Sequence, residues 1–219
     1  MKHLFCLMMT LTACLPSFAV SPKEDPFEFT HNRFAFNGLL TSSDIYMLEA
    51  SYHYMFNRNL GIGGGIGIWK NYFHDGYASG HGWELDDDAS KPSDIYLRVS
   101  AVLKSPSLVF KSAGWGLIAE PAMLFNIPYK RVCINEIHNY TVTGYHYLST
   151  NKGQWLTLEM RAGVYVNFGP VGFSAGYGLS NLDIYSPYRH LSYKGTSFKR
   201  FYPGKALMQG AYLSATYYF

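Results

Sequence analysis

The sequence predicts an all-β fold, an eight-stranded antiparallel up-and-down transmembrane β-barrel. Three observations support this prediction. Segments with a period-two alternation of apolar and polar or small residues recur along the chain, as expected for strands with two unlike faces. Short and long links alternate between these segments, which is typical of transmembrane barrels. The chain also ends on such a segment, and its last residue is the aromatic Phe219.

The composition agrees with strands that alternate between lipid and lumen. The chain of 219 residues has 19 Tyr, 15 Phe and 21 Gly, its charged fraction is only 15%, and its mean hydropathy is −0.07. A helical membrane protein would be more apolar, because each span needs about 20 mostly apolar residues. The net charge of +3 is spread without a basic stripe, so we expect no nucleic-acid partner.

The first residues form a targeting segment. Lys2 and His3 precede the apolar run 4–15, and Ser17-Phe18-Ala19 places small residues where a signal peptidase reads them. We therefore expect a cleaved signal peptide over 1–19, a periplasmic segment over 20–32 and the barrel over 33–219. In the alternative, Leu11-Thr12-Ala13-Cys14 resembles a lipobox, and Cys14 would be lipidated. The mature chain keeps only Cys133 and forms no internal disulfide, and the fate of this thiol stays open.

Eight segments carry the alternation. A weaker first strand lies near 33–40. In 46–56, Tyr and Leu alternate with Met47, Glu49, Ser51 and His53, and in 60–69 isoleucines alternate with glycines. The segments 95–104 and 115–125 follow. The clearest one, 154–168, places Leu156, Leu158 and Met160 on one face and Thr157, Glu159 and Arg161 on the other. The set ends with 171–180 and 207–219.

The links predict closure and orientation. Short links lie near 57–59, 105–107 and 169–170, whereas long polar links lie at 73–92, 128–153 and 183–206; the first outer link, near 41–43, is also short. Short turns face the periplasm and long loops face outside in such barrels. Closure is required in lipid, because an open strand edge would leave backbone groups without partners. A soluble barrel would show the reverse pattern, apolar inside and polar outside.

The inward faces hold an unusual set of charges. Buried charges must pair or they cost several kcal/mol each, and an eight-stranded barrel is just wide enough for its own side chains. The set indicates a plug of ion pairs or, in the alternative, a narrow ion path. The glycines of 61–67 are better interpreted as a small inward face that complements Trp69, Tyr96 and Trp155 than as a nucleotide loop. The predicted lumen residues are Glu49, His53, Arg98, Lys104, Glu120, Glu159 and Arg161.

Three stretches resemble the porin-like outer-membrane β-barrel family of Bacteroidota: Ala119-Glu120-Pro121, the run 172–182 (GFSAGYGLSNL) and the terminal strand to Phe219. The resemblance implies this fold and the bacterial outer membrane, but little about function. The last strand also resembles the C-terminal assembly signal of outer-membrane proteins, so we expect the barrel-assembly machinery to be a partner. Its signal residues would be Leu213, Ala215, Tyr217 and Phe219.

The long links carry charged side chains of opposite kinds. The first holds His74, Asp75, His81, Glu84 and Asp86 to Asp88, but their spacing matches no known metal site. We predict no metal and no cofactor. The last is cationic, and such side chains suit the phosphates of lipopolysaccharide; the alternatives are a solvated loop or pairing with the acidic loop. Its predicted anion contacts are Arg189, Lys194, Lys199 and Arg200.

One motif suggests an enzyme. His190-Leu191-Ser192 resembles the His-x-Ser of lipid A deacylases, in which the histidine is base to the serine and a glutamate orients it. Tyr193 stands where that family has asparagine, and no Asp or Glu follows Asp183. The leading hypothesis is therefore a non-enzymatic outer-membrane barrel whose loops contact lipopolysaccharide, surface glycan or a protein. A lipid A deacylase-like hydrolase and a small-ion channel are the alternatives.

Overall fold

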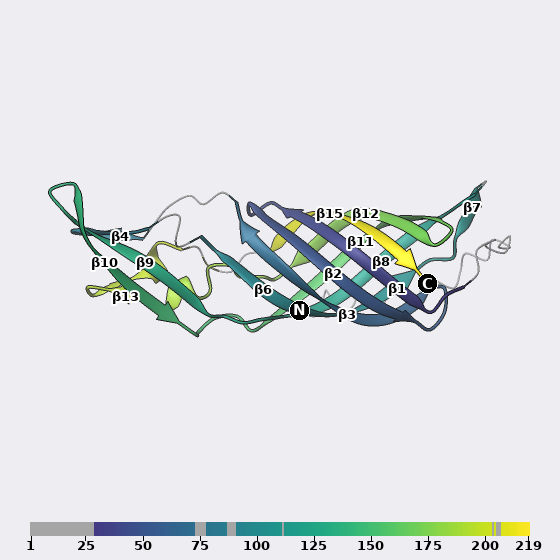
Figure 1. Ribbon diagram of the computed structural model, residues 1–219, viewed down its shortest axis with the longest axis horizontal. Coiled ribbons are helices and arrows are strands. Elements are labelled where there is room, and N and C mark those ends of the chain that lie inside the picture. The colour runs from purple at the N-terminus through teal and green to yellow at the C-terminus, as the bar shows by residue number, and fades with distance from the viewer. Residues whose placement is uncertain (1–28, 73–77, 87–90, 111, 203, 205–206) are drawn as a thin grey trace.

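The computed structural model describes residues 29–219 except 73–77, 87–90, 111, 203 and 205–206. The predicted signal peptide over 1–19, with Cys14 and Ala19, lies outside the described residues, as do His74, Asp75, Asp87 and Asp88. The chain forms an elongated molecule in which a β-barrel continues at one end into a second, smaller group of strands (Figure 1). No helix in the described part of the chain is long and apolar enough to cross a membrane.

Eight long strands close into an antiparallel barrel, which confirms the predicted fold. Strands that neighbour one another in the chain pair with each other, and β1 pairs with β15, so that Phe36 lies opposite Ala215. A short extra strand, β7 (Leu108–Phe110), lengthens the turn before β8. The barrel strands are β1 (Asn32–Thr41), β2 (Ile45–Met55), β3 (Leu60–Asn71), β6 (Ser93–Lys104), β8 (Ala113–Asn126), β11 (Leu156–Phe168), β12 (Val171–Ser180) and β15 (Met208–Tyr218).

The two faces of the barrel wall differ as the alternation predicts. Apolar side chains point outward all around the wall, for example Phe36, Leu97 and Leu213, which are 53%, 59% and 68% exposed. Glu49, Arg98 and their neighbours point inward and are buried. Trp155 is an exception: we expected it to point into the lumen, but it is 62% exposed, because it precedes β11, which begins at Leu156.

The glycines of β3 allow neighbouring groups to approach closely. A Cβ on Gly67 would lie 2.3 Å from Cζ of Tyr96, and one on Gly63 would lie 2.0 Å from the carbonyl oxygen of Tyr52. Each of these contacts is shorter than real Cβ contacts. The small inward face therefore makes room for the buried Tyr96, as the sequence suggested.

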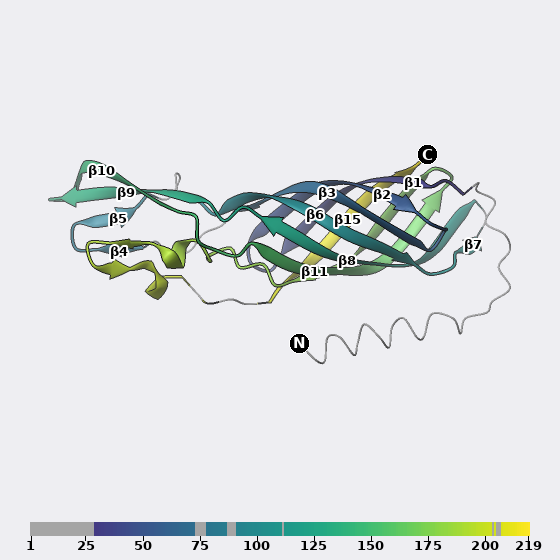
Figure 2. The same cartoon turned by 90° about the horizontal axis from the view of Figure 1, so that it is seen from below.

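The three long links leave the same end of the barrel, here called the loop end, and the short links lie at the turn end. Beyond the loop end they fold into a second unit, here called the head (Figure 2). A four-stranded sheet with the order β10-β9-β5-β4 and a small β13–β14 hairpin form it. The alternation in the sequence predicted no strands in these links. The head consists of β4 (Ser79–Gly80), β5 (Trp83–Leu85), β9 (Lys130–His138), β10 (Thr141–Thr150), β13 (Ser192–Tyr193), β14 (Thr196–Ser197) and two 3-10 turns, η2 (Tyr188–His190) and η3 (Phe198–Arg200).

The head has its own hydrophobic core, to which all three long links contribute. The indole of Trp83 stacks on the ring of Phe198, with centroids 5.7 Å apart. Burial of large aromatic and aliphatic side chains stabilises such a unit, at about 1.5–3 kcal/mol for each one buried. The core residues are Ala78, Trp83, Leu85, Val132, Ile134, Tyr188, Leu191, Phe198 and Tyr202.

Candidate functional site: the lumen and the head

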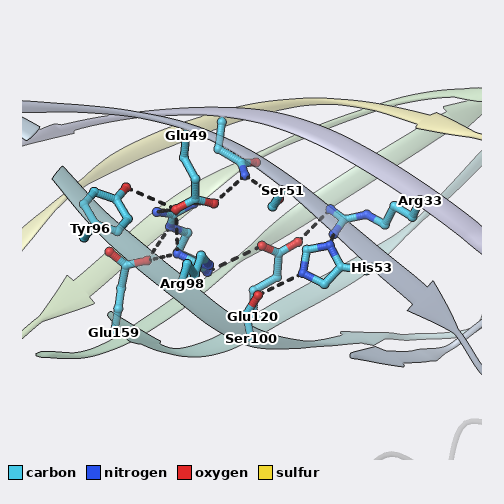
Figure 3. A network of polar contacts seen from close by, with 11 residues as sticks. Arg33, Glu49, Ser51, His53, Tyr96, Arg98, Ser100, Glu120 and Glu159 are labelled. Atoms are coloured by element: carbon cyan, nitrogen blue, oxygen red, sulfur yellow. Dashed lines mark hydrogen bonds and ion pairs between the residues drawn. The ribbon is translucent and has the colours of Figure 1, made fainter. Parts of the chain in front are cut away.

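A network of ion pairs fills the middle of the lumen (Figure 3). Arg98 of β6 lies near its centre and faces carboxylates from three other strands. Its Nη1 is 3.2 Å from Oε2 of Glu49 and also pairs with Glu159, and its Nη2 is 3.8 Å from Oε2 of Glu120. All of these side chains are at most 3% exposed. Residues predicted to share the lumen are therefore in direct contact there.

Arg161 extends the network on β11. Its Nε is 2.7 Å from Oε1 of Glu159, and its Nη2 is 3.2 Å from Oε2 of Glu49. Glu49 also accepts hydrogen bonds from Asn37 Nδ2 at 2.8 Å and from the Tyr96 hydroxyl at 3.1 Å. The partners of the Glu49 carboxylate thus lie on β1, β6 and β11. These contacts connect different parts of the barrel wall.

Arg33 completes the network, although sequence analysis did not include it among the lumen residues. Its Nη2 donates to Oε1 of Glu120 at 2.7 Å, and its Nη1 lies 3.3 Å from Nδ1 of His53. The other ring nitrogen of His53 is 2.8 Å from the Ser100 hydroxyl. With Arg33 the network holds three arginines and three glutamates, so these six charges balance.

Lys104 belongs to a different place in the lumen. Its Nζ lies 3.0 Å from the Tyr218 hydroxyl and 4.1 Å from the centroid of the Tyr165 ring. Lys104 ends β6 at the turn end, whereas Arg98 lies in the middle of the same strand. The alternation correctly predicts that it points inward, but its described contacts are with tyrosines and not with the predicted lumen charges. Tyr218 also forms a hydrogen bond with Arg33 and so links Lys104 to the edge of the network.

Apolar side chains fill the lumen on both sides of the charges. Toward the turn end, Met55, Val102, Ile118 and Tyr165 form a cluster against which Phe29 packs. A larger cluster lies toward the loop end. An ion moving along the lumen would meet one of these clusters on either side of the charges. The cluster at the loop end consists of Leu39, Ile45, Met47, Trp69, Tyr96, Ala122, Leu124, Leu182, Ile184, Met208 and Tyr212.

The predicted anion-contact residues of the last loop fall into two groups. Arg189 pairs with Asp183, and Lys194 Nζ is 2.8 Å from Oε1 of Glu136 on β9. The hydrogen bonds from Lys194 and Tyr193 hold the pKa of Glu136 below its usual value. Lys199 and Arg200 are exposed on η3. Solvation, one of the two alternatives, thus fits Lys199 and Arg200, whereas the carboxylates that pair with Arg189 and Lys194 belong to the last and the second link and not to the acidic loop.

His190 and Ser192 lie close in sequence, but their positions in the described residues differ from those of a hydrogen-bonded pair. His190 ends η2 and Ser192 begins β13, and both are exposed on either side of the buried Leu191. The described hydrogen bonds include none between them. The two carboxylates described nearby have other partners, since Asp183 binds Arg189 and Glu136 binds Lys194. A triad requires base, nucleophile and acid within hydrogen-bond reach, and the described contacts do not assemble one here.

The residues of the predicted assembly signal lie on the outer face of the last strand. Leu213, Ala215 and Tyr217 alternate outward along β15, and the ring of Tyr217 stacks on that of Phe219, with centroids 5.9 Å apart. This edge closes the barrel by pairing with β1. Whether the assembly machinery reads these side chains stays a prediction.

The solved structures to which the chain is similar include small outer-membrane barrels. No family model and no curated protein sequence matches it. A major outer membrane protein from Thermus thermophilus superposes with a TM-score of 0.48 at 9% identity, over 88% of this chain and all of that one. The outer membrane enzyme PagL gives 0.43 at 9% identity, over 85% and 99%. Ail, the attachment invasion locus protein of Yersinia pestis, gives 0.40 at 11%, over 87% and 99%. At such low identity the likeness concerns fold alone.

Proposed function

We propose that this chain is a non-enzymatic protein of the bacterial outer membrane, whose barrel anchors a binding head outside the cell. After removal of the signal peptide, the barrel-assembly machinery would insert it through its C-terminal strand. The apolar outer wall supports a location in the membrane, since strands with lipid-facing apolar side chains and polar inward ones are typical of such barrels. We also propose that the chain is related to the porin-like outer-membrane β-barrel family of Bacteroidota.

The observation that carries this proposal is the division of the molecule into a filled barrel and an ordered head. The lumen contains neutralised ion pairs between two apolar layers, which supports an anchor more than an ion path. The head, by contrast, keeps its sheet and core beyond the loop end. A loop that only connects strands needs no core of its own, so we infer that this unit is kept for binding.

The proposed ligands are lipopolysaccharide, a surface glycan or a protein partner. For lipopolysaccharide the proposed contacts are Lys199 and Arg200, because both are exposed in the head and lysine and arginine suit phosphate groups. Arg189 and Lys194 contribute less in this proposal, since each already pairs with a carboxylate.

Two measurements test the proposal. An outer-membrane protein with a closed barrel should migrate faster on SDS gels before boiling than after it, whereas a soluble protein without such a shift would contradict the location. The second measurement is the amount of lipopolysaccharide that copurifies with the protein. The double variant K199E/R200E should carry less than the parent, and R58E, which changes an exposed cation in a turn at the opposite end, should carry the same amount. Equal retention by both variants would contradict the proposed contact.

A further inference from the structure

Strand β10 is an open edge of the head sheet. In the order β10-β9-β5-β4 it is a terminal strand, and its ladder partner is β9. Seven of its ten residues are exposed and none is fully buried. In the part of the chain that the structure describes, no segment pairs with its outer side. Its outward backbone N–H and C=O groups are therefore available to another strand.

This edge lacks the sequence features that usually prevent an edge strand from pairing with another chain. Natural edge strands carry lysine or proline, or are very short, but Thr141–Thr150 reads TVTGYHYLST, without proline and without Asp, Glu, Lys or Arg. Its one irregularity is a register shift between Val142 and Gly144, near the hairpin tip. From Gly144 to Thr150 the ladder with β9 is regular. A stretch of seven residues is thus open and regular.

The tip of the hairpin has a second unusual feature. Asn139 and Tyr140 have φ angles of 48° and 62°, in the left-handed region, and the Tyr140 side chain is fully exposed. Glycine is the residue commonly found at the second position of such a turn. A bulky residue is unfavourable in this conformation, because its Cβ crowds the following carbonyl oxygen. Strain of this kind at an exposed aromatic side chain points to a role at the surface.

We infer that the β10 edge binds the β10 edge of a second copy of this chain. An uncharged strand placed against itself brings no like charges together, whereas a charged edge would repel its own copy. Antiparallel pairing centred on His146 would place Tyr145 opposite Tyr147 of the other copy, twice. Both tyrosines are well exposed, at 69% and 58%, and aromatic cross-strand pairs are among the favourable ones.

Symmetry fixes the direction of this pairing. In a closed two-fold dimer both copies use the same residues in the same way. An antiparallel ladder meets this condition, because facing residues exchange equivalent hydrogen bonds; in a parallel ladder the bonds are slanted and facing residues have unequal roles. The two-fold axis therefore stands perpendicular to the sheet, between the two strands, and the two copies of β10 point in opposite directions.

Opposite strand directions place the two barrels on opposite sides of the contact. β9 runs away from the barrel and β10 returns toward it, with a large component along the long axis of the molecule (Figure 2). Reversing β10 thus turns the second barrel to face the first across the paired heads. If the barrels lie in outer membranes, as the proposed function states, the two membranes belong to two cells. The inferred partner is the same protein on a neighbouring cell.

A single contact of this kind is weak. Specific stable interfaces bury roughly 1,200–2,000 Å² in total, and one strand edge of ten residues per copy offers less than that. Many copies on two apposed membranes act together, and linked weak contacts can raise overall binding by about 10²–10⁴. We therefore expect clumping of cells that display many copies and little dimer formation by the purified protein.

Crosslinking between two cell populations tests the register. In a Cys133→Ser background, one population carries Tyr145→Cys and the other Tyr147→Cys, each with its own tag. After mixing and mild oxidation, a disulfide-linked dimer with both tags is expected, and neither population alone should give one, because each cysteine would face a tyrosine. In the second test, Y145K/Y147K should abolish clumping by placing like charges together. The control E84K changes an exposed residue of the inner strand β5 and should leave clumping intact.

The outcomes separate this inference from the proposed function. Labelling of Tyr145→Cys on intact cells by a membrane-impermeant maleimide, without crosslinks or clumping, would overturn the pairing and leave the surface location standing. Absence of labelling, with labelling restored in lysed cells, would overturn both. Crosslinks that form within a single population of Tyr145→Cys cells would overturn the pairing centred on His146, because the introduced cysteine would then face the same cysteine of the other copy.

Discussion

Removing one charge from the lumen tests the reasoning about the ion-pair network most directly. The variant E49Q keeps the shape of the side chain and its contact with Asn37, but it leaves three arginines with two glutamates. Arg98 and Arg161 each lie 3.2 Å from the Glu49 carboxylate and are buried. Breaking a buried ion pair by removing one partner costs about 3–5 kcal/mol, because an uncompensated charge remains.

The double variant E49Q/R161M provides the matched comparison. It leaves Arg33 and Arg98 with Glu120 and Glu159, so the remaining charges balance again. Replacing both partners of a buried pair by groups of similar size is often close to neutral. We therefore expect the double variant to be more stable than E49Q, despite its additional change.

Stability is measured by urea titration of the barrel in detergent, with the shift between folded and boiled bands on SDS gels as the readout. E49Q should unfold at a clearly lower urea concentration than the parent. The control E84Q, an exposed change in the head, should stay within about 0.5 kcal/mol of it. An unchanged midpoint for E49Q, or a double variant weaker than E49Q, would refute the view that charge balance holds this lumen together.

Three further predictions concern the lumen, the head and the enzyme alternative. The purified protein should give no steady single-channel conductance in planar bilayers, since apolar clusters lie on both sides of the charges; a stable current lost on changing Arg98 would contradict this. Because the folded pKa of Glu136 is lowered, its contact with Lys194 should stabilise the head above the usual pKa of about 4.3 and be lost as pH falls through the lowered folded value. The protection of the β13 and β14 amides relative to their intrinsic exchange rates should fall in that acid window, and Glu136→Gln should remove this pH dependence of protection. Ser192→Ala should leave the mass spectrum of whole-cell lipid A unchanged; an altered lipid A mass would favour the hydrolase.

The barrel could be predicted from the sequence because lipid and lumen impose opposite demands on alternate residues. The segment expected at 171–180 coincides with β12, and the one expected at 154–168 differs from β11 by two residues at its start. Trp155 lies within this difference, and for this reason it was predicted to face the lumen although it is exposed. Alternation gives the side of the wall on which a residue lies, but it does not give its height along the barrel. For this reason Lys104 was grouped with Arg98, although it lies at the turn end beside Tyr218.

The parts of the head that could not be predicted do not lie between two contrasting environments, as the strands of the barrel wall do. β10 is exposed on most residues, so no apolar face marks it as a strand. The head core combines Trp83, Ile134 and Phe198 from three links, and only their meeting in space reveals it. Arg33 was missed because the first strand alternates weakly, and because its partner Glu120 is 87 residues away.

The position of Arg33 also has a consequence for the order in which the protein assembles. Arg33 lies on the first barrel strand and Glu120 on the fifth, so a sheet of the first four strands would carry an arginine without its carboxylate. The wall becomes continuous only when β15, at the very end of the chain, reaches β1. A partly assembled sheet would therefore expose both unmatched charges and an unpaired backbone edge to lipid. In the membrane location proposed above, closure and charge matching would have to occur before, or together with, entry into the hydrocarbon layer, so insertion strand by strand would be unfavourable.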